Sequence, residues 1–538
     1  MFSETLRELL HGRFHRLTRR NVLTATGIAA AAHQLNAVPT AKAAEGGALR
    51  IGPDIFQSIG VRPLINCKGT FTIVSGSQSL PEVKQAMMEA SKHYVHLDEL
   101  MAAVGQRLAT LTGAEWGMVS NGCAAALAHA TAACIAGTDP EKLQRIPNLT
   151  GLKNEVIVPR HSRNVYDHAI RMLGVKMVEV NDLDQLRKAF NPRTAMVMVL
   201  AAPQADREPL STQTISRIAN EHNVPVLVDA AAEVLTIPNK HLQAGATLVA
   251  YSGGKCLRGP QAAGLLLGRK DLVQAAWLHS APHHAPGRAL KCGKEEIMGM
   301  LAAVEAWVKR DYEAEMRTWE SWLGSIAKTV ESVPGVTTEV RQPNGLSNKS
   351  PQLTIRWDAA KIGISGREME KYVYESDPRI VLGAASGDRG GREASSVTIM
   401  PYMMMPDDHK VVAERLRAVL SSPPKLPEAQ KPSGPVANVD GQWKISIRYS
   451  LGSADHQLVF EQKDNRLAGT HRGDITNGEI RGAVEGPEVR FASRHRYEGT
   501  SLTYAFTGKL ENDRLSGTVQ LGEYGSAEWT AERFRYNA

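Results

Sequence analysis

A lysine that follows a glycine turn and an aspartate that ends an apolar run are the residues best suited to covalent chemistry. Lys255 follows Ser252-Gly253-Gly254 and the apolar run 246–251, and Asp229 follows the apolar run 224–228, 26 residues before the lysine. An amine can bond to an aldehyde, and a buried carboxylate can keep a ring nitrogen protonated. The pattern therefore predicts a pyridoxal 5′-phosphate (PLP) site, in which Lys255 forms the Schiff base and Asp229 pairs with the pyridine nitrogen.

Each residue alone has a simpler interpretation. Lys255 can be a surface lysine after a glycine turn, and Asp229 can cap the helix that follows it. Desolvation behind an apolar strand would lower the pKa of Lys255 and make its amine a better nucleophile. Because the two residues and their flanking runs occur together, we favour the PLP interpretation.

A phosphate group needs backbone donors, and the start of a helix supplies them. Residues 116–120 are typical of a strand, Asn121-Gly122 of a turn, and residues 123–134 of an alanine-rich helix. We expect the backbone N–H groups of Gly122, Cys123 and Ala124 and the hydroxyl of Ser252 to bind the phosphate. An ordinary strand–turn–helix unit is the alternative.

The exposed face of the cofactor ring calls for an aromatic or imidazole group. His161 follows the apolar run that ends at Pro159 and is the predicted stacking residue. Tyr166 and His168 compete with it, and a surface histidine is the plain alternative.

Basic side chains are the candidates for recognising an anionic substrate. Arg258, Arg288 and Lys291 are predicted to serve this purpose, together with Lys294 nearby. Arg392 is predicted to bind the substrate carboxylate, with Arg379 and Arg389 as rivals. A solvated loop and helix start explain the first group almost as well.

Apolar runs that alternate with helical patterns from about residue 80 to residue 420 predict the fold. Strands are expected at residues 155–159, 176–180, 195–200 and 224–228, and helices at residues 165–173 and 212–222. This alternation is typical of a mostly parallel sheet with helices on both faces. We expect an N-terminal arm and PLP-binding large domain at 44–300 and a small α+β domain at 301–420. A long amphipathic stretch at 294–330 should connect them.

The C-terminal hundred residues have a different period. Residues 421–440 are rich in proline and poor in apolar groups, which indicates a linker. Residues 441–538 then alternate apolar and polar side chains with period two, as half-exposed antiparallel strands do. A separate all-β meander or small barrel is expected there. No ligand-binding residue stands out in it.

The first 43 residues have the composition of an export signal. Arg19-Arg20 precedes a short apolar stretch, and Ala41-Lys42-Ala43 is a small-residue cleavage site. The paired arginines favour the twin-arginine route and an exported or periplasmic protein. An alanine-rich helix with a chance arginine pair is the alternative. Residues 1–43 carry six basic and two acidic side chains, so the formal charge falls from +7 to +3 without them.

Composition excludes several other classes of protein. With 43% apolar residues, the 538-residue chain can bury a sizeable core, and it has no apolar run long enough for a membrane span. The near-neutral charge of the remainder gives no reason to expect a nucleic-acid surface. The five cysteines show no metal-ligand spacing, so neither a metal site nor a disulfide framework is expected.

At these residues the chain resembles the fold type I PLP enzymes. The resemblance is to the branch that holds bacterial selenocysteine synthase (L-seryl-tRNA(Sec) selenium transferase) and glucosaminate-phosphate ammonia-lyase. It covers about residues 50–420, and the matching segments are 252–261, 163–167 and 288–296. It implies that Lys255 binds PLP, that Asp229 pairs with the ring nitrogen and that His161 stacks on the ring. It also implies a homodimer or larger assembly with active sites at subunit contacts.

The leading hypothesis is a PLP-dependent lyase that acts at Cα and Cβ of a small amino acid or amino sugar acid and releases ammonia. A selenium or sulfur transferase and an aminotransferase of the same fold are alternatives. An export signal would separate the enzyme from a cytoplasmic tRNA partner, which argues against selenium transfer. A third hypothesis is an envelope binding protein in which the β domain carries the function.

Overall fold

The computed structural model describes residues 46–388, 394–426 and 435–534. By its internal contacts the chain divides into two compact units, and Arg62–Lys425 forms one of them. The other unit contains the C-terminal strands. The division at residue 425 lies within the predicted linker.

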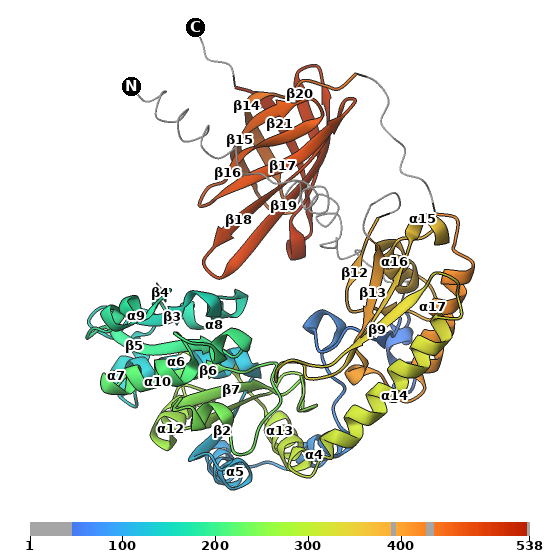
Figure 1. The fold of residues 1–538 in the computed structure, drawn as a ribbon. Helices are drawn as coiled ribbons and strands as arrows, with labels where there is room; N and C mark the ends of the chain where they lie inside the picture. Colours follow the sequence, from blue (N-terminus) through green and yellow to red (C-terminus); the bar gives the residue numbers. More distant parts are fainter. Residues whose placement is uncertain (1–45, 389–393, 427–434, 535–538) are drawn as a thin grey trace, which may run out of the picture. The chain divides into compact units, whose positions relative to one another are not determined.

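The centre of the first unit is a seven-stranded sheet, drawn mostly in green in Figure 1. Its strands, in spatial order, are β2 (Trp116–Ser120), β8 (Gly264–Gly268), β7 (Leu248–Ser252), β6 (Val226–Asp229), β5 (Thr194–Leu200), β3 (Glu155–Pro159) and β4 (Lys176–Val180). Only β8 runs antiparallel to its neighbours. The predicted mostly parallel sheet is therefore confirmed, and its central strands are nearly continuous apolar runs because helices cover them.

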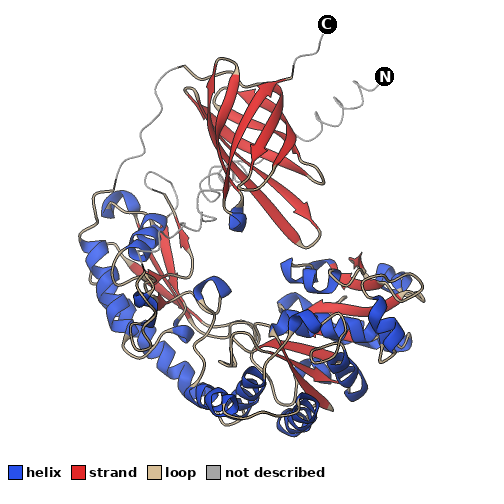
Figure 2. Cartoon of the chain, turned by 180° about the vertical axis from the view of Figure 1, so that it is seen from behind, coloured by secondary structure: helices blue, strands red, loops and turns tan. Residues whose placement is uncertain are grey.

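Helices flank this sheet (Figure 2). They are α4 (Pro81–Ser91), α5 (Leu97–Thr112), α6 (Gly122–Ala136), α7 (Pro140–Arg145), α8 (His168–Arg171), α9 (Leu183–Ala189), α10 (Thr212–Glu221), α11 (Lys240–Gln243), α12 (Lys270–Leu278) and α13 (Lys294–Trp307). Every residue of α6 from Ala125 to Ala136 is buried. Small alanine side chains allow this helix to pack closely on several strands at once. The helix expected at 165–173 is instead a 3-10 turn, η4 (Val165–Asp167), followed by the short α8.

A smaller α+β region completes the first unit. It contains α14 (Tyr312–Val330), β9 (Thr337–Arg341), β10 (Gln352–Trp357), α15 (Ala359–Ile362), α16 (Gly366–Glu375), β11 (Ile380–Val381), β12 (Ala385–Ser386), β13 (Ser395–Ile399) and α17 (Asp408–Ser421). Four strands form an antiparallel sheet in the order β12-β13-β10-β9, and β11 pairs in parallel with β1 (Ile65–Asn66). The stretch expected to be continuous at 294–330 is two helices. It breaks before α14 because the Asp311 carboxylate accepts from the backbone N–H of Ala314 at 2.9 Å and starts a new helix.

The C-terminal region is a closed antiparallel barrel, drawn in orange-red in Figure 1. Its strands are β14 (Gly441–Arg448), β15 (Ser453–Lys463), β16 (Arg466–Arg472), β17 (Asn477–Glu485), β18 (Glu488–Tyr497), β19 (Thr500–Glu511), β20 (Arg514–Gln520) and β21 (Ser526–Arg533), and β21 pairs back with β14. The predicted all-β domain is confirmed as a barrel in which each strand pairs with the next. Closure leaves no free sheet edge.

Three further observations bear on the expectations from sequence. All five cysteines are unpaired and buried. Within the residues that the structure describes, no helix has the length and apolar character of a membrane span. The short helix α3 (Ile55–Ser58) lies within the segment expected to form the N-terminal arm.

Candidate active site

Several predicted site residues lie at one edge of the seven-stranded sheet. β2, β7 and β6 point the same way, because β8 is antiparallel to both β2 and β7 and because β6 is parallel to β7. Ser120 and Ser252 both pair with Gly264, so these two strand ends are level with each other. Asp229 ends β6 at the same edge. Ligands of open α/β sheets bind beyond such carboxyl ends.

Asp229 is buried, with 1% of its surface exposed. Its Oδ1 accepts from the backbone N–H of Ala231 at 3.1 Å and from the Cys123 thiol at 3.6 Å. Burial raises the pKa of this carboxyl group, and the Ala231 N–H and the Lys255 ammonium oppose that shift. Oδ2 has no hydrogen-bond partner among the described residues. A protonated ring nitrogen would supply both the missing partner and the missing positive charge.

Lys255 lies in the turn after β7 and is half-buried. Its Nζ lies over the ring of Tyr166, 5.8 Å from the ring centroid. Its charge also lowers the pKa values of Asp229 and Cys123, against the upward effect of burial on both. The amine therefore lies in the electrostatic environment of the buried carboxylate, as the PLP prediction requires.

The segment 163–167, one of the matching segments of the sequence, builds a rigid turn that presents Tyr166. Arg163 donates to Asp167 at 2.6 Å, and Arg171 donates to the other oxygen of Asp167 at 2.9 Å. Asp167 is fully buried, and the Asn164 amide oxygen accepts from the Tyr166 backbone N–H at 2.7 Å. These bonds fix η4, so Tyr166 is held toward Lys255 although its own side chain is 56% exposed.

The predicted phosphate donors open α6. The helix begins at Gly122 directly after β2. A Cβ placed on Gly122 would have no atom within 4 Å, so the space beside the start of the helix is open. Cys123 is buried and Ala124 is exposed. Gly264 of β8 allows the close approach of this helix, because a Cβ there would lie 2.3 Å from the Gly122 carbonyl carbon. A fifteen-residue helix with an open N-terminus is a suitable anion site.

His161 lies in the 3-10 turn η3 (Arg160–Ser162), directly after β3. Strand β3 is two positions from β6 in the sheet, and the His161 side chain is exposed. Partial desolvation lowers its pKa. Its stacking on the ring stays a prediction. Tyr166, the rival named from sequence, is the aromatic group that contacts Lys255.

Within the described residues, no side-chain hydrogen bond or ion pair joins the predicted basic residues to Lys255. Arg258 donates from Nε to the Gln78 carbonyl at 3.1 Å, and burial lowers its pKa. Arg288 and Lys291 are exposed on and beside the 3-10 turn η6 (Arg288–Leu290), and Lys294 is paired with Glu295. Arg379 stacks on Tyr374, 4.8 Å from the ring centroid. Arg389 and Arg392 lie outside the described residues.

Cys123 has a second function that the sequence did not indicate. It was expected to contribute only its backbone N–H, but its thiol also contacts Asp229. Burial and the nearby carboxylate raise the pKa of this thiol, so it stays protonated and can donate. No spacing rule reveals this contact, because it depends on the order of four strands.

Comparison with known proteins supports the same assignment. A family model described as aminotransferase class-V matches residues 158–289. A 5′-C-glycyluridine monooxygenase-decarboxylase of Streptomyces sp is 30% identical over 378 residues, which cover 68% of this chain and 92% of that protein. A D-glucosaminate-6-phosphate ammonia lyase of Salmonella typhimurium (strain 14028s / SGSC 2262) is 28% identical over 328 residues, which cover 59% of this chain and 86% of that protein.

A solved structure of a D-glucosaminate-6-phosphate ammonia-lyase superposes with a TM-score of 0.61 at 26% identity. The match covers 69% of this chain and 99% of that one. The resemblance inferred from residues 252–261 is thereby confirmed, and the protein is a PLP-dependent enzyme. The chain belongs to the aminotransferase class-V family of fold type I PLP enzymes.

Proposed function

We propose that this enzyme is a lyase that releases ammonia from a small amino acid or amino sugar acid carrying a β-hydroxyl group. One observation carries the proposal. Lys255 and Asp229 lie together at the edge of a sheet, in a chain of which 69% matches the D-glucosaminate-6-phosphate ammonia-lyase structure.

The site provides places for each part of PLP. The Lys255 amine would hold the aldehyde carbon, and Asp229 would face the ring nitrogen. The start of α6 and the Ser252 hydroxyl would take the phosphate. When bound, PLP withdraws electrons from the substrate Cα and so stabilises the charge left by loss of a proton.

Lys255 is the group placed to move protons. Its amine would take the proton from Cα and become an ammonium, which the face of Tyr166 stabilises through a cation–π contact of about 0.5–2 kcal/mol. The same ammonium can protonate the β-hydroxyl as it leaves as water. Hydrolysis of the resulting product consumes one water and releases a keto acid and ammonia, so atoms balance.

We further propose that Arg288 and Lys291 bind an anionic substrate group. Both are exposed, and neither side chain makes a hydrogen bond or ion pair within the described part of the chain. We further propose a homodimer with active sites at the subunit contacts, in which these side chains reach the partner's site. Light scattering of the purified protein tests the assembly, and a monomer would exclude it.

The decisive experiment is an ammonia assay on purified holoenzyme. D-glucosaminate 6-phosphate, unphosphorylated D-glucosaminate and both enantiomers of serine form a panel that varies the phosphate, the chain length and the stereochemistry. We expect stoichiometric ammonia and keto acid from at least one amino sugar acid, and none from the Lys255→Ala variant. Transfer of the amino group to a keto acid without free ammonia would identify an aminotransferase instead.

The Streptomyces relative supplies a second candidate function, because this chain matches 92% of it. An oxygen electrode separates the two reactions. Oxidative decarboxylation consumes O₂ and releases CO₂, whereas elimination does neither. Oxygen uptake coupled to turnover would replace the lyase proposal with an oxygenase.

We also propose that the enzyme is exported through the twin-arginine route. Residues 1–45 lie outside the described residues, so the proposal rests on the Arg19-Arg20 pair and the cleavage motif. Cell fractionation of the full chain tests it, with Arg19→Lys/Arg20→Lys as the variant. Export is supported if the parent protein is found in the periplasm and the double-lysine variant stays in the cytoplasm. The same distribution of parent and variant contradicts it.

A further inference from the structure

The interior of the barrel changes character from one end to the other. Inward residues at one end form an aromatic core that includes Trp443, Phe460, Phe491 and Trp529. At the other end the inward positions of β15, β16 and β18 are His456, His471, Ser493 and His495, each at most 5% exposed. The sequence had given no sign of a ligand residue in this domain, and the structure brings this cluster together as a candidate.

The three imidazoles form one hydrogen-bonded chain. His456 Nδ1 lies 2.9 Å from His471 Nε2, and His471 Nδ1 lies 3.0 Å from His495 Nε2. His495 Nδ1 then meets the Thr476 hydroxyl at 2.9 Å, while Ser493 Oγ lies 2.7 Å from His471 Nδ1. Gly478 makes room for this chain, because a Cβ there would lie 2.5 Å from His495 Cδ2.

This geometry does not fit a metal centre. His471 turns different ring nitrogens toward its two neighbours, so the three rings do not converge on one point. No metal-binding group of three or more ligands occurs in the part of the chain that the structure describes. Burial lowers the pKa of His471 to about 2 and also lowers the pKa values of His456 and His495. The three histidines are therefore neutral at physiological pH.

One nitrogen of the chain has no partner. His456 Nε2 makes no hydrogen bond within the described residues, whereas the other five ring nitrogens each do. If His456 carries its proton on Nδ1, Nε2 is an acceptor. If all three tautomers reverse, Nε2 becomes a donor. The histidine chain can thus accept a hydrogen bond from a neutral ligand or donate one to it.

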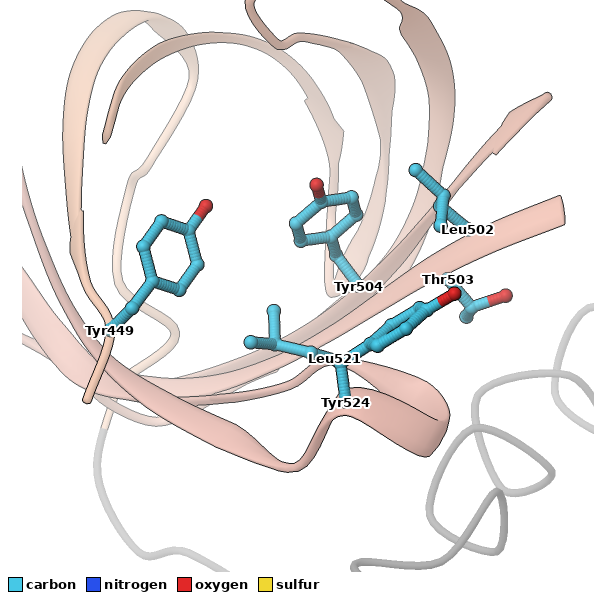
Figure 3. A pocket seen from close by; sticks show the side chains of 6 residues that line it. All are labelled: Tyr449, Leu502, Thr503, Tyr504, Leu521 and Tyr524. Carbon is cyan, nitrogen blue, oxygen red and sulfur yellow. The ribbon is translucent and has the colours of Figure 1, made fainter. Parts of the chain in front are cut away.

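A cavity opens at this end of the barrel (Figure 3). Its volume is about 370 Å³, and Tyr449, Leu502, Thr503, Tyr504, Leu521 and Tyr524 line it. Tyr504 joins the cavity to the histidine chain, since its ring centroid lies 6.1, 5.2 and 5.0 Å from those of His456, His471 and His495. The volume lies in the range of small-molecule pockets, which typically combine apolar walls with a few convergent polar groups.

The hairpins around the mouth carry exposed apolar side chains. In a barrel of this topology, alternate hairpins lie at the same end. The four between β14 and β15, β16 and β17, β18 and β19, and β20 and β21 lie at the end where the cavity opens. Each contributes one exposed apolar or aromatic residue: Leu451 (93%), Ile475 (71%), Tyr497 (45%) and Tyr524 (64%). Such a collar favours an apolar molecule approaching the cavity.

We propose that the barrel binds a small, uncharged, mainly apolar molecule with an aromatic or aliphatic body and one hydroxyl, phenol or carbonyl group. The body would lie against the three tyrosines and two leucines, and the polar group would reach His456 Nε2. The neutral histidine chain offers no countercharge, and the Asp474 carboxylate near Tyr449, Tyr504 and His456 disfavours an anion. This site is distinct from the PLP site and does not depend on the proposed lyase reaction.

Titration of the full-length holoenzyme with Nile red tests the site. The dye is uncharged, and its excitation lies away from PLP absorption. We expect saturable binding of one dye per chain. Leu502→Trp, which fills the cavity, should weaken binding by about tenfold or more. The matched control Lys509→Trp, on the exposed outer side of the same strand, should change it by less than about twofold. Unsaturable binding, or equal losses in both variants, would overturn the site.

Displacement of the dye tests the class of ligand. Three compounds share one ring system: 1-naphthol, 1-naphthoate and (1-naphthylmethyl)trimethylammonium. We expect naphthol to displace Nile red at concentrations about tenfold lower than either ion does. His456→Phe should remove most of this preference while leaving dye binding within a few fold. A stronger effect of the cation would overturn the uncharged class in favour of a tyrosine cage for amines. If Leu502→Trp does not fold, Leu521→Trp in the mouth hairpin takes its place.

Discussion

Asp229 at the sheet edge and His471 inside the barrel are both buried titratable groups, but the fold treats them differently. Burial works against the charged form of each, raising the pKa of the acid and lowering that of the base. Asp229 keeps one oxygen free and has the Lys255 amine nearby. His471 has both ring nitrogens bonded, and its electrostatic neighbours are other imidazoles.

The difference separates a site for a charged partner from one for a neutral partner. A buried carboxylate with an open oxygen gains most from a cation, because the cation offsets its desolvation. His471, a neutral imidazole with both ring nitrogens bonded, gains nothing from a charge and would have to give up a hydrogen bond to hold a second proton. The α/β unit is therefore built to hold an ionised ring, and the barrel to hold an uncharged molecule.

The largest expected effect comes from Lys255. Lys255→Ala removes both the covalent anchor and the proton carrier, so we expect turnover to fall by about 10²–10⁴-fold or more. Borohydride reduction followed by peptide mass spectrometry should find the cofactor on Lys255 in the parent protein and on no peptide of the variant. Nile red binding should be unchanged. Cofactor fixed to another lysine would contradict the assignment of the site.

The next effect concerns the turn that presents Tyr166. Asp167→Asn removes the charge that pairs with Arg163 and Arg171, both largely buried. Breaking a buried pair from one side costs about 3–5 kcal/mol, and we expect the lower end because Arg163 keeps its contact with Glu179. Urea unfolding of the α/β unit measures the loss. The control Glu414→Gln breaks an exposed pair with Arg417 and should cost less than about 1 kcal/mol.

Lys255 and Asp229 could be predicted from sequence because each follows an apolar run. A strand end is local information, and parallel strands bring their carboxyl ends to one edge whatever their order. The local sequence could not decide whether His161 or Tyr166 lies near the lysine. Both follow β3, and only the turn fixed by Arg163 and Asp167 shows which one contacts the lysine.

The histidine chain was missed for a related reason. Period-two alternation places His456 on the same face as Leu458 and Phe460, so its inward direction was readable. Whether it meets His471 depends on the register of the hairpin between β15 and β16, which pairs Leu458 with His471. Pattern alone gives the face of a strand but not the neighbour across it.

A pH series sharpens the contrast between the two regions. The pKa of His471 falls from 6.5 when unfolded to about 2 in the barrel. Below pH 6.5, His471 therefore binds a proton in the unfolded chain but not in the folded barrel. The barrel should lose about 1.4 kcal/mol of stability per pH unit as the pH falls below 6.5. Hydrogen exchange of barrel peptides at pH 7.5, 6.5 and 5.5 would measure this loss. His471→Phe should flatten the dependence, and an unchanged slope would show that other groups cause it.

The smallest expected effect tests the thiol behind Asp229. Cys123→Ala removes the weak S–H donor to Oδ1, which helps to keep the carboxyl group ionised. The pKa of Asp229 should rise, the acid limb of the kcat/KM profile should move to higher pH, and activity should fall about two- to fivefold. Cys123→Ser restores a donor and should recover most of the loss. Cys134→Ala, in the same helix but in the last turn, is the matched control and should leave the profile in place. An identical shift in both alanine variants would show that helix packing, rather than the thiol, is responsible. A shift confined to Cys123→Ala would establish that the acid of this site is tuned from the helix that also offers its N-terminus to the phosphate.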